Sequence, residues 1–444
     1  MSTAVPAAQN RPPAADGSVL PGMRSSAGRA MEPPGTAPAA AWNEAEERSG
    51  GVAGGAPRRR RVAIVADYLE ERWPSMDLAA ELTGLAVSRH GGDAFDPAVL
   101  RPKLARILRG RLRVREHGAK NFDRYVGRYL AYPRWLRPRA RRFDLFHVID
   151  HSYAHLVGVL PAGRTVVTCH DLDAFRSLIG DEREARPFWF RQTMQRVLKG
   201  FRAAAHVVCD SEAVRREIVE HGLVPPARLS VVPLPAHPDF APHPDAAADA
   251  RAAALLGPRD PAAADLLHVG ASVPRKNIPF LLEVFAAVRR RHPRARLVRV
   301  GGALTGYQRG VAERLGVTDA VVTLPHVDRP TLAAVYRRCT ALLLPSEREG
   351  FGWPVLEAMA CGTPVVASAA LPTVREIGGE AIGYAPAGDV QGWIEAVDRL
   401  LLDHGDRREW QGRRAAALER ADAFSLEAYA AGILAVYRRV LETR

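Results

Sequence analysis

The sequence is poor in cysteine and has no long apolar run, and both absences argue against several classes of protein. Its 444 residues include four cysteines, and no two of these form a Cys-x-x-Cys pair. This spacing argues against a zinc site or a disulfide framework, and it favours a reducing, cytoplasmic compartment. No stretch of about 18 apolar residues predicts a transmembrane helix. The N-terminus also lacks the apolar segment of a signal peptide.

Positive charge is concentrated in one segment. Residues 101–142 contain fifteen Lys or Arg residues against only Glu116 and Asp123, so this segment alone accounts for the formal net charge of +13. Such a patch implies an anionic partner. Two interpretations of this segment are about equally favoured: a face that contacts an anionic membrane, and a solvated helical face with extended arginines. Nucleic acid ranks well behind, because no nucleic-acid-binding motif accompanies the charge. Pro102 and Pro133 predict that the segment is not one long helix.

Short apolar runs alternate with helical patterns along most of the chain. Residues 1–60 are rich in Ala, Pro, Gly and Ser, and this composition predicts a disordered tail. One alternating series occupies 61–240 and a second occupies 265–425, with a Pro- and Ala-rich linker at 241–264. The alternation predicts an α/β protein with two Rossmann-like, doubly wound domains that face a central cleft. The expected strands are 62–65, 143–149, 164–169, 205–209, 229–233, 266–270, 296–300, 320–324 and 341–344.

The strongest signal for chemistry is the run SEREGFGWPVLEA at 346–358, which follows the strand expected at 341–344. Gly350 and Gly352 allow a ligand to approach the main chain closely. Pro354 suits the first turn of a helix, where its missing N–H costs nothing. The free N–H groups of that helix and its dipole can receive a diphosphate.

Two glutamates flank this turn. Glu349 lies in the loop, and Glu357 lies one turn inside the expected helix, so the two can contact different parts of one extended ligand. Carboxylates are good acceptors for paired sugar or ribose hydroxyls. For either glutamate alone an incidental strand–loop–helix is favoured, but the whole run at the end of a strand strongly favours a functional site.

This run resembles the signature of glycosyltransferase family 4, retaining enzymes of the GT-B fold, and the similarity continues through residues 359–379. The resemblance implies that Glu357 binds the nucleotide ribose and that Glu349 contacts the donor sugar or its leaving region. It also implies that the amides around Phe351 and Gly352 lie near the diphosphate. In this fold the C-terminal helix, here within 426–444, packs back on the N-terminal domain.

A second basic signal is VGASVPRKN at 269–277. A Lys and an Arg here can neutralise the charge on a departing nucleoside diphosphate. The family commonly uses a lysine at this place, which corresponds to Lys276. Many members also have a basic residue where this chain has Ala271, and Arg275 is the expected substitute.

A histidine follows a strand in the N-terminal domain. The resemblance implies that His170 faces the donor sugar, although a lone histidine at a strand end is more often a satisfied loop residue. His151 is a weaker candidate. One departure from the family is the first loop of this domain, 67–77, which has no glycine where members usually place a Gly-rich turn.

The sequence therefore predicts a retaining hexosyltransferase that uses a nucleotide-sugar donor and a glycan or lipid-linked acceptor, in the cytoplasm or at the inner face of the membrane. No metal or cofactor is expected, because nothing resembles an Asp-x-Asp or His/Cys ligand set. The expected catalytic residues are Glu349, His170 and Lys276. The expected donor-binding residues are Arg275, Lys276, Gly350, Phe351, Gly352 and Glu357. Two rivals remain: a nucleotide-sugar epimerase, and a nucleotide-sugar-binding or scaffold protein without turnover.

Overall fold

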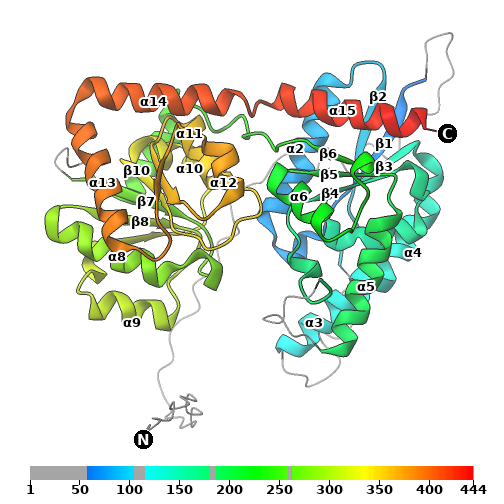
Figure 1. Ribbon diagram of the computed structural model, residues 1–444, viewed down its shortest axis with the longest axis horizontal. Helices are drawn as coiled ribbons and strands as arrows, with labels where there is room; N and C mark the ends of the chain where they lie inside the picture. Colours follow the sequence, from blue (N-terminus) through cyan, green and yellow to red (C-terminus); the bar gives the residue numbers. More distant parts are fainter. Residues whose placement is uncertain (1–57, 105–115, 180–186, 259, 261–262, 444) are drawn as a thin grey trace, which may run out of the picture. The chain divides into compact units, whose positions relative to one another are not determined.

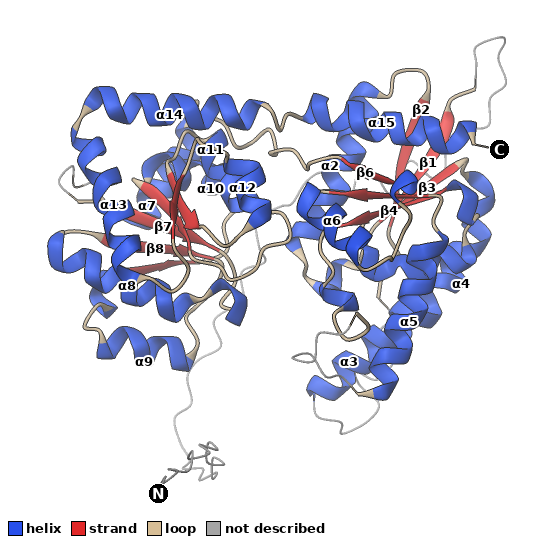
Figure 2. Cartoon of the chain, in the orientation of Figure 1, coloured by secondary structure: helices blue, strands red, loops and turns tan. Residues whose placement is uncertain are grey.

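Two sheets of six parallel strands organise the chain (Figure 1). The computed structural model describes residues 58–104, 116–179, 187–258, 260 and 263–443. The predicted tail therefore lies outside the described residues up to residue 57, and so do residues 105–115 of the basic segment. Figure 2 shows helices on both faces of each sheet, which is the doubly wound α/β arrangement predicted from the sequence.

The N-terminal sheet has the strand order β2-β1-β3-β4-β5-β6. Its strands are β1 (Arg60–Val65), β2 (Phe95–Leu100), β3 (Leu145–Val148), β4 (Thr165–Cys169), β5 (His206–Cys209) and β6 (Leu229–Val231). Its main helices are α2 (Pro74–His90), α5 (Phe188–Ala203) and α6 (Glu212–Glu220). Every residue of β3, β4 and β5 is buried, because helices cover both faces of a parallel sheet. The sequence analysis did not predict β2, which contains Pro97 and tolerates it as an edge strand.

The C-terminal sheet has the order β12-β11-β10-β7-β8-β9. Its strands are β7 (Asp265–Val269), β8 (Arg296–Val300), β9 (Val321–Leu324), β10 (Ala341–Leu344), β11 (Val365–Ser368) and β12 (Gly383–Ala385). Its helices are α8 (Ile278–Arg291), α9 (Gly306–Arg314), α10 (Arg329–Arg338), α11 (Trp353–Ala360), α12 (Pro372–Gly378), α13 (Val390–Gly405) and α14 (Arg407–Asp422). The predicted strands of this domain all form, within one or two residues of their expected ends.

The basic segment is not one long helix, as predicted, because residues 101–104 are not helical, but Pro133 does not end the helix that begins at Glu116, contrary to the expectation from the sequence. Helix α3 (Glu116–Val126) continues into a π-helical turn (Gly127–Ala131) and then into α4 (Tyr132–Arg139). Pro133 lies in the first turn of α4, where no amide hydrogen is required. The wider π turn ends just before the proline, and irregular turns of this kind relieve the clash of a proline ring with the preceding turn.

The Ala-rich stretch that was expected to lack a pattern contains a helix, α7 (Ala246–Leu256). Asp245 caps it by accepting hydrogen bonds from the amides of Ala247 and Ala248, both at 3.0 Å. Helix α7 is tied to α10 through Asp249, whose Oδ1 lies 2.6 Å from Arg337 Nη2. Alanine is the strongest helix former, so a run of alanines behind a good cap folds without an amphipathic pattern.

The last helix, α15 (Leu426–Glu442), contacts the N-terminal sheet and α2. Two buried tyrosines make these contacts. The Tyr429 hydroxyl lies 2.7 Å from Thr83 Oγ1 of α2, and the Tyr437 hydroxyl lies 2.8 Å from His147 Nδ1 of β3. Burial lowers the pKa of His147 to about 3, so its ring is a neutral hydrogen-bonding group in this core.

The close packing of α5 at Gly200 predicts that one added methyl group strongly lowers the stability of the fold. A Cβ atom at Gly200 would lie 1.9 Å from the main-chain oxygen of Ala154, so Gly200→Ala forces the backbone apart. We expect this substitution to lower the free energy of unfolding by about 1–3 kcal/mol or more. Gly412→Ala is the matched control within α14, because a Cβ there meets nothing within 4 Å. That control should raise stability by about 0.5–1 kcal/mol. Thermal unfolding of both variants checks this, and equal midpoints would contradict it.

Candidate functional site

A buried ion pair joins two loops at the carboxyl edge of the C-terminal sheet. Strands β7 and β10 are neighbours, so the loops that follow them begin side by side. Lys276 Nζ, at the end of the first loop's 3₁₀ turn, lies 2.6 Å from Glu349 Oε1 in the second. Both side chains are less than a tenth exposed, at 7% and 6%. The sequence analysis singled out both residues, and the structure brings them into contact.

Arg275 lies on the other side of the same carboxylate. Its Nη1 lies 3.2 Å from Glu349 Oε2, and it is more exposed than Lys276. Burial by itself would raise the pKa of Glu349, but the charges of Lys276 and Arg275 hold that pKa below its usual value. Glu349 is therefore an ionised carboxylate between two cations. A hydroxyl or an anion that approaches this place would therefore meet an ionised Glu349 held between Lys276 and Arg275.

The turn into α11 depends on glycine. Gly352 is the N-terminal cap of α11 with φ of +108°, and a Cβ there would lie 3.0 Å from Val374 Cγ2. Phe351 is buried against the rings of Trp353 and Phe424, with centroids 6.1 and 6.4 Å apart. The Phe351 side chain thus anchors the turn, while its main chain leads into the N-terminus of α11 and the positive end of its dipole. This is the arrangement that the sequence predicted for an anion site.

Glu357 lies one turn inside α11 and is 8% exposed. Its Oε2 accepts a hydrogen bond of 2.8 Å from the hydroxyl of Tyr336 on α10. Burial raises the pKa of Glu357 to about 7, against the smaller opposing effects of Tyr336, Lys276 and Arg329. The carboxyl group is therefore held in place by Tyr336 and titrates near neutral pH.

A buried arginine that the sequence analysis missed lies behind this site. Arg299, on β8, is fully buried, and it donates to the main-chain oxygen of Gly270 at 3.1 Å and to Ser272 Oγ at 3.3 Å. Its Nε has no hydrogen-bond partner among the described residues. Burial alone lowers its pKa to about 10. Neighbouring His268 is also buried, and its pKa is lowered by burial, Arg299 and Lys276. A charged residue inside a buried strand is the sequence signal that could have identified Arg299.

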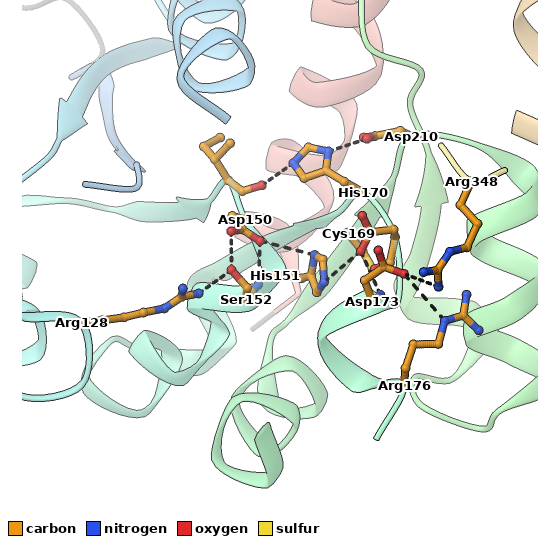
Figure 3. A network of polar contacts seen from close by, with 12 residues as sticks. Arg128, Asp150, His151, Ser152, Cys169, His170, Asp173, Arg176, Asp210 and Arg348 are labelled. Atoms are coloured by element: carbon orange, nitrogen blue, oxygen red, sulfur yellow. Dashed lines mark hydrogen bonds and ion pairs between the residues drawn. The ribbon is translucent and has the colours of Figure 1, made fainter. Parts of the chain in front are cut away.

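His170 follows β4 in the N-terminal domain, and both of its ring nitrogens have partners there (Figure 3). Nδ1 bonds the carboxylate of Asp210, and Nε2 donates to the main-chain oxygen of Ile149 at 2.9 Å. Burial opposes protonation, but Asp210 outweighs it and raises the pKa of His170 to about 9. His170 is therefore a fixed imidazolium whose ring hydrogens are both engaged in this geometry. Ser211, next to Asp210, caps α6 through a hydrogen bond from Val214 N.

A second polar network lies beside His170, and sequence reasoning also missed most of it. Figure 3 shows Asp150 between Ser152 and His151, with Arg128 on the far side of Ser152. Asp150 follows β3, and Asp67, which follows β1, is buried nearby. The common signal of these residues is an acidic side chain directly after a buried parallel strand, where ligands bind in open α/β sheets.

The two domains approach each other at Gly350. A Cβ atom at this glycine would lie 3.2 Å from the main-chain oxygen of His170 and 3.3 Å from Asp171 Oδ2. The loop that carries Glu349 thus lies next to the carboxyl edge of the N-terminal sheet.

Two surface hollows of about 410 and 420 Å³ lie around Arg164, before the start of β4, so neither belongs to this site.

Two structural findings concern ligands and membranes. Within residues 58–443 as far as they are described, no three His, Cys, Asp or Glu side chains are grouped so that they could hold a metal ion. None of the helices in the described part of the chain combines the length and the apolar character needed to cross a membrane.

Comparisons with known proteins match both halves of the chain. Residues 258–416 match the family model described as glycosyl transferases group 1, and residues 85–240 match the model of glycosyltransferase family 4. A D-inositol 3-phosphate glycosyltransferase of Kribbella flavida is 32% identical over 332 residues, which are 69% of this chain and 75% of that protein. The namesake from Kineococcus radiotolerans is 36% identical over 263 residues, or 54% of this chain and 59% of that protein.

The chain spans about half the length of several curated relatives that carry this name. A solved structure of Anabaena HepE in complex with UDP and glucose superposes with a TM-score of 0.62 at 15% identity, covering 87% of this chain and 99% of that one. That likeness concerns the fold alone. It agrees with the two parallel six-stranded sheets and identifies the GT-B fold that the sequence predicted.

The raised pKa of Glu357 predicts how stability depends on pH. In the unfolded chain this carboxyl ionises near 4.5, whereas in the folded chain it ionises near 7. Between these values the folded state holds a proton that the unfolded state has lost, so raising the pH favours unfolding. Relative to Glu357→Gln, the wild type should lose up to about 1.4 kcal/mol of stability per pH unit in this window and change little above it.

Denaturant unfolding of both proteins at several pH values between about 4.5 and 8 checks this dependence. Glu313→Gln, on an exposed position of α9, is the matched control and should track the wild type at every pH. A difference between wild type and Glu357→Gln that does not vary with pH would contradict the assignment of the titration to Glu357.

Proposed function

Because the chain belongs to glycosyltransferase family 4, we propose that it transfers a hexose-type sugar from a nucleotide-sugar donor to a glycan or lipid-linked acceptor, with retention at the anomeric carbon. The observation that carries this proposal is the ion pair of Lys276 with Glu349 beside the N-terminus of α11. It puts cations, a fixed carboxylate and the positive end of a helix dipole at one edge of the C-terminal sheet. A diphosphate with a sugar attached needs these groups together.

The donor would lie along α11. The nucleotide ribose would bond Glu357, which Tyr336 already orients, and the diphosphate would lie against the amides that follow Phe351. Arg299 supports this assignment, because no carboxylate among the described residues lies within ion-pair distance of it and a buried charge is costly without a counter-ion. The diphosphate would supply the missing anion. The structure of HepE, which has the same fold, was solved with UDP and glucose.

In the reaction, the acceptor hydroxyl oxygen bonds the anomeric carbon as the bond from that carbon to the diphosphate oxygen breaks. The diphosphate leaves with the electron pair of the broken bond and takes up the hydroxyl proton. Lys276 and Arg275 would stabilise the negative charge that develops on the leaving oxygen. Glu349 holds both cations in place and would bond the donor sugar. His170 would contribute a fixed positive charge and its main chain to the sugar site rather than a free ring nitrogen.

We propose that the transfer proceeds without a metal ion or a cofactor. Three side-chain cations, Arg275, Lys276 and Arg299, together with the positive end of the α11 dipole, lie where a metal would otherwise offset the diphosphate charge. Turnover should therefore continue in excess chelator.

Binding of nucleotide sugars tests the donor site. Ligand-observed NMR with UDP-, GDP-, ADP- and dTDP-sugars should find one nucleotide class that binds the wild type. Glu357→Ala should weaken that binding by about tenfold or more, because the ribose loses its carboxylate acceptor. Glu313→Ala, on the exposed face of α9, is the matched control and should bind like the wild type. Equal binding by Glu357→Ala and the wild type would overturn the donor site, and no binding by the wild type would overturn the proposed function.

A lipid-linked acceptor would require contact with a membrane, and we propose that α3, the π-helical turn that follows it and the start of α5 provide it. Here five large apolar side chains are exposed: Phe122, Tyr125, Leu130, Phe188 and Trp189. The two helices are neighbours, since the Tyr125 hydroxyl lies 3.5 Å from Thr193 Oγ1 (Figure 1). Basic side chains such as Arg124 and Arg191 lie on the same helices, and this mixture suits the interface of an anionic membrane.

Sedimentation with lipid vesicles tests this contact. The protein should bind phosphatidylcholine vesicles that contain phosphatidylglycerol and not vesicles of phosphatidylcholine alone. The double substitution Phe188→Ser and Trp189→Ser should weaken binding by about tenfold or more, because two exposed rings no longer enter the interface. Leu402→Ser is the matched control, since Leu402 is similarly exposed but lies on α13. Equal binding to both kinds of vesicle, or no effect of the double substitution, would contradict the proposal.

A further inference from the structure

Helix α6 of the N-terminal domain begins against a carboxylate of the C-terminal domain. The main-chain amides of Glu212 and Ala213 each donate a hydrogen bond of 2.7 Å to the side chain of Glu376 on α12, one to each carboxylate oxygen. The next amide, that of Val214, donates to the hydroxyl of Ser211, the N-cap. The first amides of a helix have no partner within the helix, so two of these three are satisfied from the other domain.

The geometry makes this contact stronger than an ordinary surface ion pair. A carboxylate at the N-terminus of a helix lies at the positive end of the helix dipole, and its two charge-assisted hydrogen bonds also fix its orientation. The side chain of Glu376 is 31% exposed, so it is partly shielded from water. Arg216 of α6 lies 3.9 Å from Glu376, but it is 59% exposed and contributes little at that distance. The two amides therefore account for most of the contact.

Helix α12, which carries Glu376, also supports the donor loop. Thr373 Oγ1, in its first turn, donates to the main-chain oxygen of Glu349 at 3.3 Å. Arg420 of α14 fixes the other end of the helix, because its Nε donates to the main-chain oxygen of Ile377 at 2.8 Å. Helix α12 is thus held at both ends, and Glu376 has a defined place relative to the loop of Glu349.

On the other side of the contact, the start of α6 is continuous with the charged pair of the N-terminal domain. Asp210, whose carboxylate bonds the ring of His170 (Figure 3), directly precedes Ser211, the N-cap of α6. The position of α6 therefore determines the position of Asp210 and, through it, that of the His170 imidazolium. One continuous set of contacts runs from Glu349 through α12, Glu376 and α6 to His170.

The chain itself passes between the domains at a different place. Its two crossing segments lie side by side, since the amide of Ala236 donates to the main-chain oxygen of Phe424 at 3.2 Å. Beside this crossing, Arg329 of α10 bonds Glu81 of α2 at 3.0 and 2.6 Å, and Glu81 also lies 3.4 Å from His237. Helices α6 and α12 belong to neither crossing segment. Their contact is therefore a separate, non-covalent tie between two domains that could otherwise rotate about the crossing.

We propose that Glu376 is a positioning residue for the proposed transfer: its carboxylate holds the start of α6, and with it the pair of His170 and Asp210, against the loop that carries Glu349. The inference rests on the proposed function and adds a residue that lies outside the donor site. Glu376 acts through the placement of the N-terminal domain, not by contact with the reacting atoms. Because the residues of the donor site all belong to the C-terminal domain, nucleotide binding does not depend on this contact, whereas transfer does.

The distance between the domains tests the contact directly. Ser88→Cys on α2 and Glu313→Cys on α9 provide one exposed cysteine on each domain for a spin label, and the four native cysteines are buried. Pulsed electron paramagnetic resonance on the full chain, without ligand, should give one narrow distance in this background. Glu376→Ala should broaden the distribution and move it to longer distances, because the amides of α6 lose their partner.

A proline tests the same contact from the other side. Glu212→Pro removes one of the two amide donors, and proline suits the first position of a helix after the extended backbone of Ser211. This variant should change the distance as Glu376→Ala does, with α6 still formed. Glu212→Ala is the matched control, because it removes the side chain and its bond to Arg215 but keeps the amide. It should leave the distance unchanged.

Turnover separates a positioning role from a structural one. Release of nucleoside diphosphate is measured at saturating concentrations of the tightest-binding nucleotide sugar, with glucose, mannose and myo-inositol offered as acceptors beside water. Glu376→Ala should lower the rate at saturation by about 10- to 100-fold and leave nucleotide affinity unchanged. Glu376→Gln should lose less, because its amide oxygen still accepts one of the two hydrogen bonds. Glu380→Ala, at an exposed position just after α12, is the matched control and should behave like the wild type.

Each outcome bears on one proposal or on the other. An unchanged distance in Glu376→Ala overturns the inference, and so does a changed distance with an unchanged rate. A loss of nucleotide affinity as large as the loss of rate also overturns it, because Glu376 would then serve the donor site itself. A wild type that binds no nucleotide sugar, or that binds one and never releases the diphosphate, overturns the proposed function. The distances alone then decide whether Glu376 holds the domains together.

Discussion

The ion pair between Lys276 and Glu349 is the interaction on which the rest of the C-terminal site depends. It ties the loop after β7 to the loop after β10 in a place where neither charge reaches water freely. Loss of Glu349 would leave the buried Lys276 without its carboxylate, which is far more costly than the pair itself, whereas loss of Lys276 would leave Glu349 with Arg275. The loop that Glu349 anchors then turns at Gly352 into α11, and α11 carries Glu357 against Tyr336. One electrostatic contact thus determines where the turn, the helix and the second carboxylate lie.

The two sheets present opposite kinds of incomplete charge at their carboxyl edges. The C-terminal edge contains a buried guanidinium, Arg299, with no carboxylate partner among the described residues. The N-terminal edge contains a buried carboxyl group, Asp67, whose pKa is raised well above its usual value by burial and by neighbouring Asp150. A structure selected for stability alone would have paired or removed the buried guanidinium. That guanidinium suits the anionic leaving group of the proposed transfer.

The sequence predicted the parts of this protein that depend on short-range patterns. Most of the buried parallel strands read as apolar runs and were predicted correctly, although β2, β11 and β12 were not predicted. The turn from Glu349 to Glu357 follows from glycine and proline at fixed spacing, and it forms as predicted. Arg299 was missed, because its importance arises from the absence of a carboxylate partner in three dimensions, which no spacing encodes. Helix α7 was missed for a different reason: an alanine run has high helix propensity but no amphipathic contrast. Pro133 was misjudged because a π turn accommodates it.

Helix α15 has a consequence for how the chain is made. Its two tyrosines complete the core around Thr83 and His147, which are 346 and 290 residues earlier in the sequence. Because α15 follows both sheets in the sequence, it is synthesised after the residues that it covers. The N-terminal sheet, although translated first, must therefore wait with His147 and the face of α2 uncovered until α15 has been made. During that interval this domain is the part of the protein most exposed to chaperones and to aggregation.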